Sequence, residues 1–316
     1  MAPNSPASLE MATVSAIQES QQPNSNAVRS SSNMLISWSD LPAWQQEESY
    51  CIERGYRKAE PSVRLCLHSL TYIHNETVSI YSHATGVVLF IILHVCFFTS
   101  ESAHRHRLAT SGDMIVLTIY FVSVTLSFML SAVIHTFRCH SEKASKLGKK
   151  FDFQGLVLMI WGATVALIYY AFVCDLELQV RYWTVTSVAA LFCSFFNLQP
   201  RFSKSKLQPF RALSLGCLSL SFFVPVIHSL VAYGLSIQTR RLALQWMIYA
   251  LICHTFCAAA HATEFPERFF PRTYDIFGAS HQIFHIMLLA GAITYTIALS
   301  QQFDFLHNTA TTCAIM

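Results

Sequence analysis

Charged residues are scarce in this sequence. Asp, Glu, Lys and Arg make up 12% of the 316 residues, about half of the roughly 25% that is usual in a soluble domain. Hydrophobic residues make up 53%. This composition excludes a soluble enzyme and a secreted disulfide scaffold. A formal net charge of +3 gives no phosphate-binding surface, so we expect no nucleic-acid partner.

Seven windows of the sequence contain no Asp, Glu, Lys or Arg at all. Each is 19 to 28 residues long, close to the roughly 20 residues that an α-helix needs to cross a hydrocarbon core about 30 Å thick. We therefore predict an all-α integral membrane protein with seven transmembrane helices. The windows are 77–100, 114–137, 153–174, 182–200, 212–239, 242–263 and 276–303.

The segments outside the windows also differ in composition. No basic patch precedes an apolar core at the start of the chain, so we expect no cleavable signal peptide. Residues 1–37 are rich in Ser, Asn, Gln and Pro and predict a disordered tail. An amphipathic cytoplasmic segment, 38–76, follows; the seven spans occupy 77–303, and 304–316 form a C-terminal tail.

Part of the amphipathic segment has helical periodicity. Between residues 62 and 74, apolar residues recur at spacings of four, three and three, with polar residues on the other faces. We predict a short helix lying on the membrane surface, with a plain loop as the alternative. The apolar stripe is Val63, Leu67, Leu70 and Ile73, and the other faces carry Arg64, His68 and Ser69.

Lys and Arg are distributed unevenly among the connections. With seven spans, the side that holds the N-terminal segment carries 16 of them and the opposite side carries 5. Because positive charge is retained in the cytoplasm, we predict a cytoplasmic N-terminus and an external C-terminus. The farnesylation signal Cys313-Ala-Ile-Met316 and the glycosylation sequon Asn75-Glu-Thr77 then face the wrong compartments, so we expect neither to be used.

The 10 cysteines do not change this interpretation. Six of them lie inside or at the ends of the predicted spans, where we expect most to be small apolar fillers and not a disulfide framework. The six are Cys96, Cys174, Cys193, Cys217, Cys253 and Cys257.

Histidines in and near the spans suggest a functional site. His281 and His285 are four residues apart at the start of the seventh span, which places both imidazoles on one helical face about 6 Å apart along the axis. This spacing is used to bind one metal ion, and the alternative is a packed pair without metal. For His94, His228, His254 and His261 we favour hydrogen-bonded packing.

The topology brings further polar residues to the same level. The second span ends at the cytoplasmic face with His135, and Ser131 lies one turn earlier; Asp152 opens the third span at that face. Three histidines and a carboxylate at one depth suit Zn²⁺, because three imidazoles leave the fourth position open for water. Asp152 would hold that water or take its proton, and Ser131 would donate a supporting hydrogen bond.

These residues resemble the progestin and adipoQ receptor family, also called the haemolysin III-related family, and within it the adiponectin receptor branch. The resemblance covers about 41–300. It departs at Ser79, Tyr81 and Ser82, where many members have Asn, Trp and Thr, and at Arg272, which replaces a common Gly. The motifs are Leu41-Pro-Ala-Trp44, His74-Asn-Glu76-Thr77, Ile80-Tyr-Ser-His83, Ser131-Ala-Val-Ile-His135, Asp152-Phe-Gln-Gly155, Phe265-Pro-Glu-Arg-Phe269 and Gly278-Ala-Ser-His281-Gln-Ile-Phe-His285.

The resemblance implies seven helices with the N-terminus inside and a zinc ion near the cytoplasmic face. Carried over to this sequence, the metal ligands are His135, His281 and His285, with Asp152 and Ser131 as polar partners beside the metal. Glu76 and His83 match the first motif of the family. Hydrogen bonding at the start of a helix is the role that we favour for them.

The resemblance also implies a function in lipid signalling and in lipid and zinc homeostasis. We expect zinc-dependent hydrolysis of the amide of a ceramide-like lipid, with ceramide, sterol or fatty-acid-class lipids as partners and an extracellular protein ligand. The alternative is a receptor or regulator with purely structural zinc. An ion transporter and a G-protein-coupled receptor fit the polar cluster and the orientation less well. The protein would be multi-pass, in the plasma membrane or an endomembrane such as the endoplasmic reticulum.

The predicted orientation can be tested with glycosylation reporters. An acceptor site inserted after Phe305 should be glycosylated in cells, because that end is predicted to be external, whereas Asn75 should remain unmodified. A mobility shift on gel electrophoresis that glycosidase treatment reverses is the measurement. Glycosylation of reporters in the N-terminal half instead would contradict the charge count.

Overall fold

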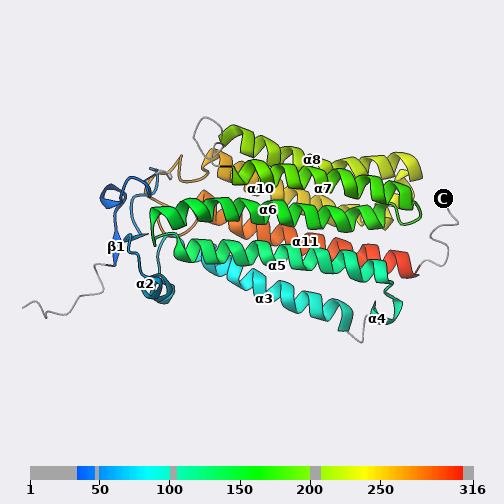
Figure 1. Cartoon of the computed structure of the whole chain (residues 1–316), viewed down its shortest axis with the longest axis horizontal. Helices are drawn as coiled ribbons and strands as arrows, with labels where there is room; N and C mark the ends of the chain where they lie inside the picture. Colours follow the sequence, from blue (N-terminus) through cyan, green and yellow to red (C-terminus); the bar gives the residue numbers. More distant parts are fainter. Residues whose placement is uncertain (1–33, 47–49, 100–104, 200–207, 309–316) are drawn as a thin grey trace, which may run out of the picture. The chain divides into compact units, whose positions relative to one another are not determined.

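The computed structural model describes residues 34–46, 50–99, 105–199 and 208–308. Helices dominate this part of the chain (Figure 1). The elements before the first long helix are β1 (Leu35–Ile36), η3 (Trp38–Asp40), β2 (Tyr56–Arg57), α2 (Val63–His68) and η4 (Ser69–Thr71). The helices that follow are α3 (Thr77–Thr99), α4 (Arg105–Leu108), α5 (Ser111–Phe137), α6 (Glu142–Ala171), α7 (Leu176–Leu198), α8 (Gln208–Tyr233), α9 (Leu235–Arg241), α10 (Leu244–Thr263) and α11 (Ser280–Asn308).

Each of the seven charge-free windows is overlapped by a long helix. These helices, as far as the chain is described, have 20 to 30 residues. By length and composition five are able to cross a membrane, namely α3, α5, α6, α8 and α11, and α9 with α10 counts as a sixth if the pair, bent by 69°, is one span. The first turns of α7 carry Glu177, Gln179 and Arg181, which makes this helix less apolar.

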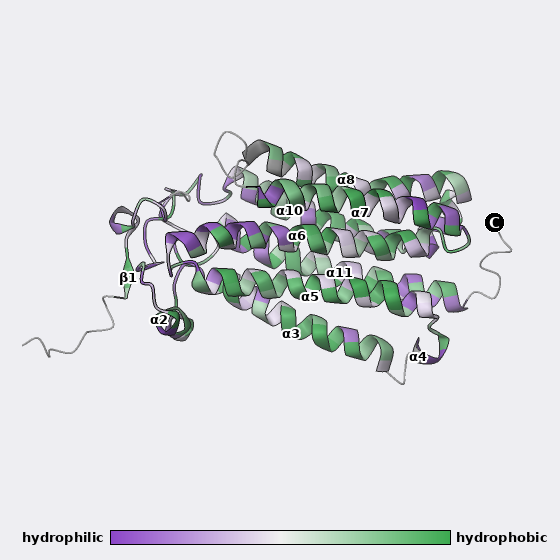
Figure 2. Ribbon diagram, in the orientation of Figure 1, coloured by the Kyte–Doolittle hydropathy of each residue, from purple (hydrophilic) through white to green (hydrophobic). Residues whose placement is uncertain are grey.

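Hydrophobic residues predominate along the middle parts of the long helices, and hydrophilic residues gather mainly toward their ends (Figure 2). Large apolar side chains on their outer faces are exposed, among them Val88, Ile115, Leu191 and Val231. In water such a surface would be costly, whereas lipid tails are as apolar as these side chains. The helices confirm a multi-pass membrane protein, and the exact number of seven spans remains a prediction.

Several helices begin at side chains that accept hydrogen bonds from free backbone N–H groups. Thr110 and Asp113 form a reciprocal capping box at the start of α5, and Ser141 and Asp175 cap α6 and α7. Each such cap contributes about 1 kcal/mol. The charged and polar residues between the windows therefore determine where these helices begin.

The packing of α6 against α5 depends on glycines spaced seven residues apart. A Cβ at Gly155 would lie 3.1 Å from Ser127 Oγ, and a Cβ at Gly162 would lie 2.5 Å from Ser123 Oγ. At Gly148 it would lie 2.8 Å from a methyl carbon of Ile134. Small residues allow the backbones of membrane helices to approach closely. This seam holds the end of α5 beside the start of α6.

The segment before α3 packs at the end of the helices where α5 ends and α6 begins (Figure 1). β1 pairs antiparallel with β2. The Arg57 guanidinium is buried and donates to the carbonyl oxygens of His135 at 2.6 Å and Thr136 at 2.9 Å, and to Ser69 Oγ at 2.9 Å. Arg57 thereby satisfies carbonyl groups that the last turn of α5 leaves free.

The predicted surface helix is present as α2 followed by the short 3-10 helix η4. Ser62 caps it, and Val63, Leu67 and Ile73 of the apolar stripe are exposed, as expected for a helix that rests on lipid. Ser69, on another face of this segment, is buried. Its hydroxyl is buried because it accepts a hydrogen bond from Arg57 and donates one to the carbonyl oxygen of Cys66 at 2.7 Å.

The boundaries of the two predicted tails differ from those of the observed elements. β1 lies within the range 1–37, and α11 continues through Asn308, beyond residue 303. The rest of the predicted N-terminal tail, and 309–316 with the farnesylation signal, lie outside the described residues. Near its end α11 forms a bidentate ion pair from Asp304 to Arg105 of α4, with N···O distances of 3.0 and 2.7 Å.

The cysteines fit the interpretation as apolar fillers with one exception. Eight of the nine cysteines in the described part of the chain are free thiols, and Cys174, at the end of α6, is in a disulfide. Cys66 and Cys139 lie with their Sγ atoms 3.7 Å apart and are not bonded covalently.

The glycine seam makes a specific prediction. Gly162→Ala should destabilise the protein by about 1–3 kcal/mol, because the new methyl group overlaps Ser123 and forces α5 and α6 apart. Thermal unfolding of the purified protein in detergent is the measurement. Gly216→Ala is the matched control, since a Cβ at that position of α8 meets no described atom within 4 Å. Equal stability of the two variants would contradict the close packing.

Candidate metal centre

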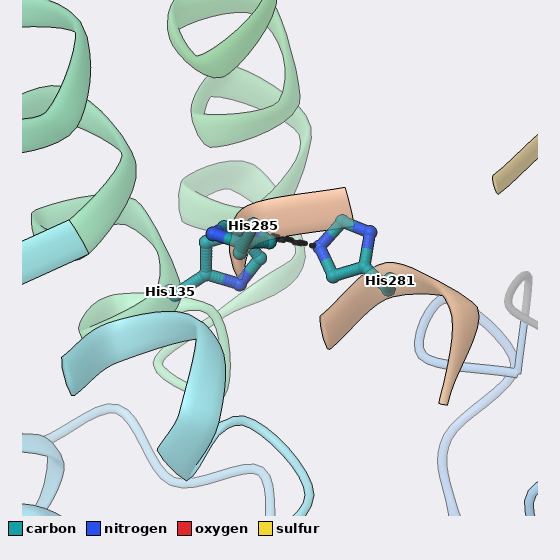
Figure 3. Close-up of side chains that lie close together, drawn as sticks. All are labelled: His135, His281 and His285. Atoms are coloured by element: carbon teal, nitrogen blue, oxygen red, sulfur yellow. Dashed lines mark hydrogen bonds between the residues drawn. The ribbon is translucent and has the colours of Figure 1, made fainter. Parts of the chain in front are cut away.

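Three histidines from α5 and α11 converge. They lie where α5 ends and α11 begins, close to the segment that precedes α3. His135 lies in the last turns of α5, and His281 and His285 lie in the first turns of α11. Figure 3 shows the three rings turned toward one another. Each offers one ligand atom, and these atoms lie within 4.8 Å of one another, so the group could hold a metal ion.

The atoms that converge are the Nε2 nitrogens. His281 Nε2 lies 3.3 Å from His135 Nε2 and 3.1 Å from His285 Nε2. Tetrahedral nitrogen ligands that are 2.0–2.1 Å from zinc are separated by about 3.3–3.4 Å. The distances therefore fit one small metal ion held by three imidazoles, with one coordination position left over.

The chemistry of the donor set supports the same conclusion. His135 and His285 are almost completely buried, with 2% and 1% of their surface exposed, and they lie on helices that are apolar over most of their length. Three imidazoles whose nitrogens face one another cannot all be protonated in such an environment, because charged groups in membrane helices are costly. Neutral imidazole is the form that binds a metal ion.

Glu76 lies directly behind His135. The Nδ1–H of His135 donates to Glu76 Oε2 at 2.6 Å, and Arg138 donates to the other carboxylate oxygen, Oε1, at 3.1 Å. Glu76 is almost fully buried, just before the first residue of α3. The expectation that it makes hydrogen bonds at the start of a helix is not met, because its carboxylate contacts two residues at the end of α5.

The backbone of Glu76 is held by His74. Burial, with a contribution from the charge of Arg57, lowers the pKa of His74 to about 4. The His74 ring is therefore neutral at physiological pH, and its Nδ1 accepts a hydrogen bond from the Glu76 N–H at 3.1 Å. A neutral ring is needed here, because a protonated imidazole has no acceptor.

His83 lies behind His285. Their Nδ1 atoms are 3.1 Å apart and their ring centroids are 4.0 Å apart. His83 is 2% exposed and its ring also packs on Phe128 at 4.7 Å between centroids. The sequence alone did not predict this contact, because it depends on the register of α3 against α11.

The start of α11 is held by two further polar residues that the sequence analysis missed. The buried carboxylate of Glu267 accepts hydrogen bonds from the backbone N–H of Ser280, at 2.7 Å, and from its hydroxyl. The Gln282 amide donates to the carbonyl oxygens of Asn75 at 2.9 Å and Ile276 at 2.7 Å. The contact with Asn75 joins the start of α11 to the start of α3.

Asp152 and Ser131 are near the histidines without hydrogen bonds to them. Asp152 is half-buried on α6, close enough for its charge to act on His135 and His261. Ser131 is buried, one turn before His135, and among the described residues its hydroxyl has no hydrogen-bond partner. The structure thus brings the three predicted ligands together and leaves the two predicted polar partners at the edge of the cluster.

The other span histidines have packing partners. His94 Nε2 lies 3.3 Å from Thr118 Oγ1. His228 Nδ1 and the Tyr182 hydroxyl form a hydrogen bond of 2.9 Å. His254 Nδ1 donates to the carbonyl oxygen of Ala250 at 2.6 Å. The His261 ring packs beside that of His281, with centroids 5.4 Å apart.

The amino-acid sequence is similar to those of known membrane proteins. Residues 71–296 match the family model described as haemolysin-III related. The adiponectin receptor protein of Drosophila melanogaster is 32% identical over 264 residues, which are 84% of this chain and 58% of that protein. The chain therefore spans less than two thirds of this relative's length.

Two further relatives are matched along most of their own length. The ADIPOR-like receptor IZH2 of Saccharomyces cerevisiae is 28% identical over 273 residues, 86% of this chain and 85% of that protein. Progestin and adipoQ receptor family member 3 of Homo sapiens is 29% identical over 265 residues, 80% of this chain and 81% of that protein. The match covers α3 to most of α11 and includes all three clustered histidines, so the chain belongs to the haemolysin III-related family, which includes the progestin and adipoQ receptors.

Proposed function

We propose that this protein is an adiponectin-receptor-like, zinc-dependent hydrolase that cleaves the amide bond of ceramide-like membrane lipids and thereby acts in lipid signalling. The single observation that carries the proposal is the convergence of three Nε2 atoms at 3.1 and 3.3 Å within the apolar helices. Three imidazole ligands leave a fourth position for a water molecule, as in catalytic zinc sites.

His135, His281 and His285 would hold the zinc ion through their Nε2 atoms. When bound, zinc acts as a Lewis acid and lowers the pKa of a coordinated water to about 7. The half-buried carboxylate of Asp152 would accept a proton from the attacking water and return it to the leaving amine. Water adds to the amide carbon, the C–N bond breaks, and the products are a fatty acid and an amine.

Ser131 suits a supporting role. Its buried hydroxyl lies one helical turn from His135 and has no partner in the described part of the chain. Leaving such a hydroxyl unpaired costs about 1–3 kcal/mol. A polar atom of the substrate or a water at the site would provide the missing partner.

The proposal includes seven spans with a cytoplasmic N-terminus. The contacts of Arg57 and Glu76 with the end of α5 support one common end for the N-terminal segment and the histidines. The excess of Lys and Arg in the connections at this end supports its cytoplasmic location. A substrate would then reach the metal from the inner leaflet. The names of the matched relatives support a receptor function, and the proposal includes an extracellular protein ligand.

The second candidate is a receptor in which zinc only joins α5 to α11. One observation favours it: no hydrogen bond connects the carboxylate of Asp152 with the three histidines among the described residues. A structural zinc usually has four protein ligands and contributes folding energy. The two candidates therefore differ in the role of Asp152: it takes a proton in the hydrolase and has no catalytic role in the receptor. Substitution of Asp152 distinguishes them.

The metal ligands can be tested by substitution. Replacing His281 and His285 together by Ala should abolish zinc binding, because two of the three imidazoles are lost. Elemental analysis of purified protein is the measurement. His94→Ala and His228→Ala serve as controls and should retain about one zinc per chain. Unchanged zinc in the double variant would mean that the pair is only packed.

The enzymatic role depends on Asp152. Asp152→Ala should retain most of the zinc and the unfolding temperature, since the imidazoles remain, but should lower fatty-acid release from ceramide by at least about a hundredfold. Zinc content, thermal stability and fatty-acid release would be measured on one preparation. Joint loss of zinc and stability would favour the structural-zinc receptor. So would wild-type protein that hydrolyses no lipid beyond its zinc-free control.

A further inference from the structure

Helix α3 contributes none of the three candidate metal ligands. Two polar side chains nevertheless contact the ligands, one directly before α3 and one on it. Glu76 lies directly before Thr77, and His83 follows seven residues later. Seven residues make almost two full helical turns, so both side chains face the same way, about 10 Å apart along the axis. They reach different ligands: Glu76 contacts His135, and His83 contacts His285.

For His135 the hydrogen bonds define which ring nitrogen carries the proton. A carboxylate only accepts hydrogen bonds, so the contact of 2.6 Å to Glu76 Oε2 requires the proton on Nδ1. Nε2, which lies 3.3 Å from His281 Nε2, is then free to present its lone pair to a metal ion. A hydrogen bond to a carboxylate also makes the imidazole a more basic ligand.

Hydrogen bonds also define which ring nitrogen of His285 carries the proton. Its Nε2 faces His281 at 3.1 Å, so its proton is on Nδ1 when Nε2 binds a metal ion. His83 Nδ1 must then accept a hydrogen bond from the Nδ1–H of His285 at 3.1 Å, which places the proton of His83 on Nε2. His83 Nε2 is buried and has no partner among the described residues, so His83 is held in a costly position. A side chain that only packs would not need this arrangement.

The carboxylate of Glu76 is itself fixed in place. Arg138, at the end of α5, holds its second oxygen at 3.1 Å, and His74 holds its backbone N–H. The Glu76 carboxylate therefore does not cap the first backbone N–H groups of α3. At the start of α3, Thr77 N–H donates to the carbonyl oxygen of His74, and Thr77 Oγ1 accepts from the backbone N–H of His74 at 2.9 Å.

We infer that Glu76 and His83 are positioning residues that fix the ring orientation and the metal-binding tautomer of His135 and His285, and thereby determine the affinity of the metal site. The inference rests on the proposed binding of zinc by the three histidines. It assigns a chemical role to the two polar positions of α3 and makes this helix a part of the metal centre.

The test uses full-length protein purified in detergent, stripped of metal and titrated with Zn²⁺ against a chelator of known affinity. Glu76→Ala and His83→Ala should each weaken zinc binding by about 10- to 100-fold, the usual effect of losing such a partner. Glu76→Gln and His83→Gln keep an acceptor oxygen and should lose less than the corresponding Ala variants.

Two controls separate positioning from general damage to α3. His94→Ala removes a histidine from the same helix, where it contacts Thr118, and should leave zinc affinity unchanged. The unfolding temperature of the metal-free Gln variants should stay close to that of the metal-free wild type, because each Gln keeps a hydrogen-bonding oxygen. In Co²⁺-substituted protein, the visible absorption bands should shift in the Glu76 and His83 variants and remain in His94→Ala, because they report ligand geometry.

The outcomes distinguish the inference from the proposed function. If wild type binds zinc and the Glu76 and His83 variants bind it equally tightly, the inference is wrong and the metal site stands. Equal weakening by His94→Ala also overturns the inference, because the loss would then reflect the stability of α3. Wild-type protein that binds no zinc overturns both. If an Ala variant does not fold, its Gln counterpart decides by the same comparison.

Discussion

Three imidazole nitrogens that face one another inside apolar helices are the constraint on which the rest of this structure depends. Two of the three rings are buried and the third is half-buried, so each needs a partner from the protein, a bound cation or a water held in the site. Glu76, His83 and the buried Arg57 supply partners to the ligands or to their backbone. The segment before α3, α3 itself, α5 and α11 are thereby organised around one point.

Much of the helical arrangement is predictable from charge alone. Because charged side chains are costly in lipid, each charge-free window overlaps a long helix. The predicted alternation of the spans places His135 and the pair His281 and His285 at one level. Their spacing of four residues is a local helical property. The cluster could therefore be predicted from the sequence, with ligands from two helices that are 146 residues apart.

Other features depend on side-chain geometry that no periodicity encodes. A breakpoint near Gly234, which has a φ of 85°, separates α8 from α9, and the window 212–239 gives no sign of it. The role of Glu76 and His83 requires the register of α3 against both α5 and α11. The burial of Ser69 likewise depends on Arg57, which belongs to a strand twelve residues earlier.

The glycine seam between α5 and α6 has a consequence for how substitutions combine in this protein. Where a glycine of α6 faces a serine of α5 at van der Waals distance, the two positions share one volume. Their substitutions should therefore be non-additive: a methyl group added at Gly162 should be tolerated better when Ser123 is also replaced by Gly. A substitution that enlarges one partner of the seam therefore needs a smaller residue at the other if the spacing of α5 and α6, which carry His135 and Asp152, is to be kept.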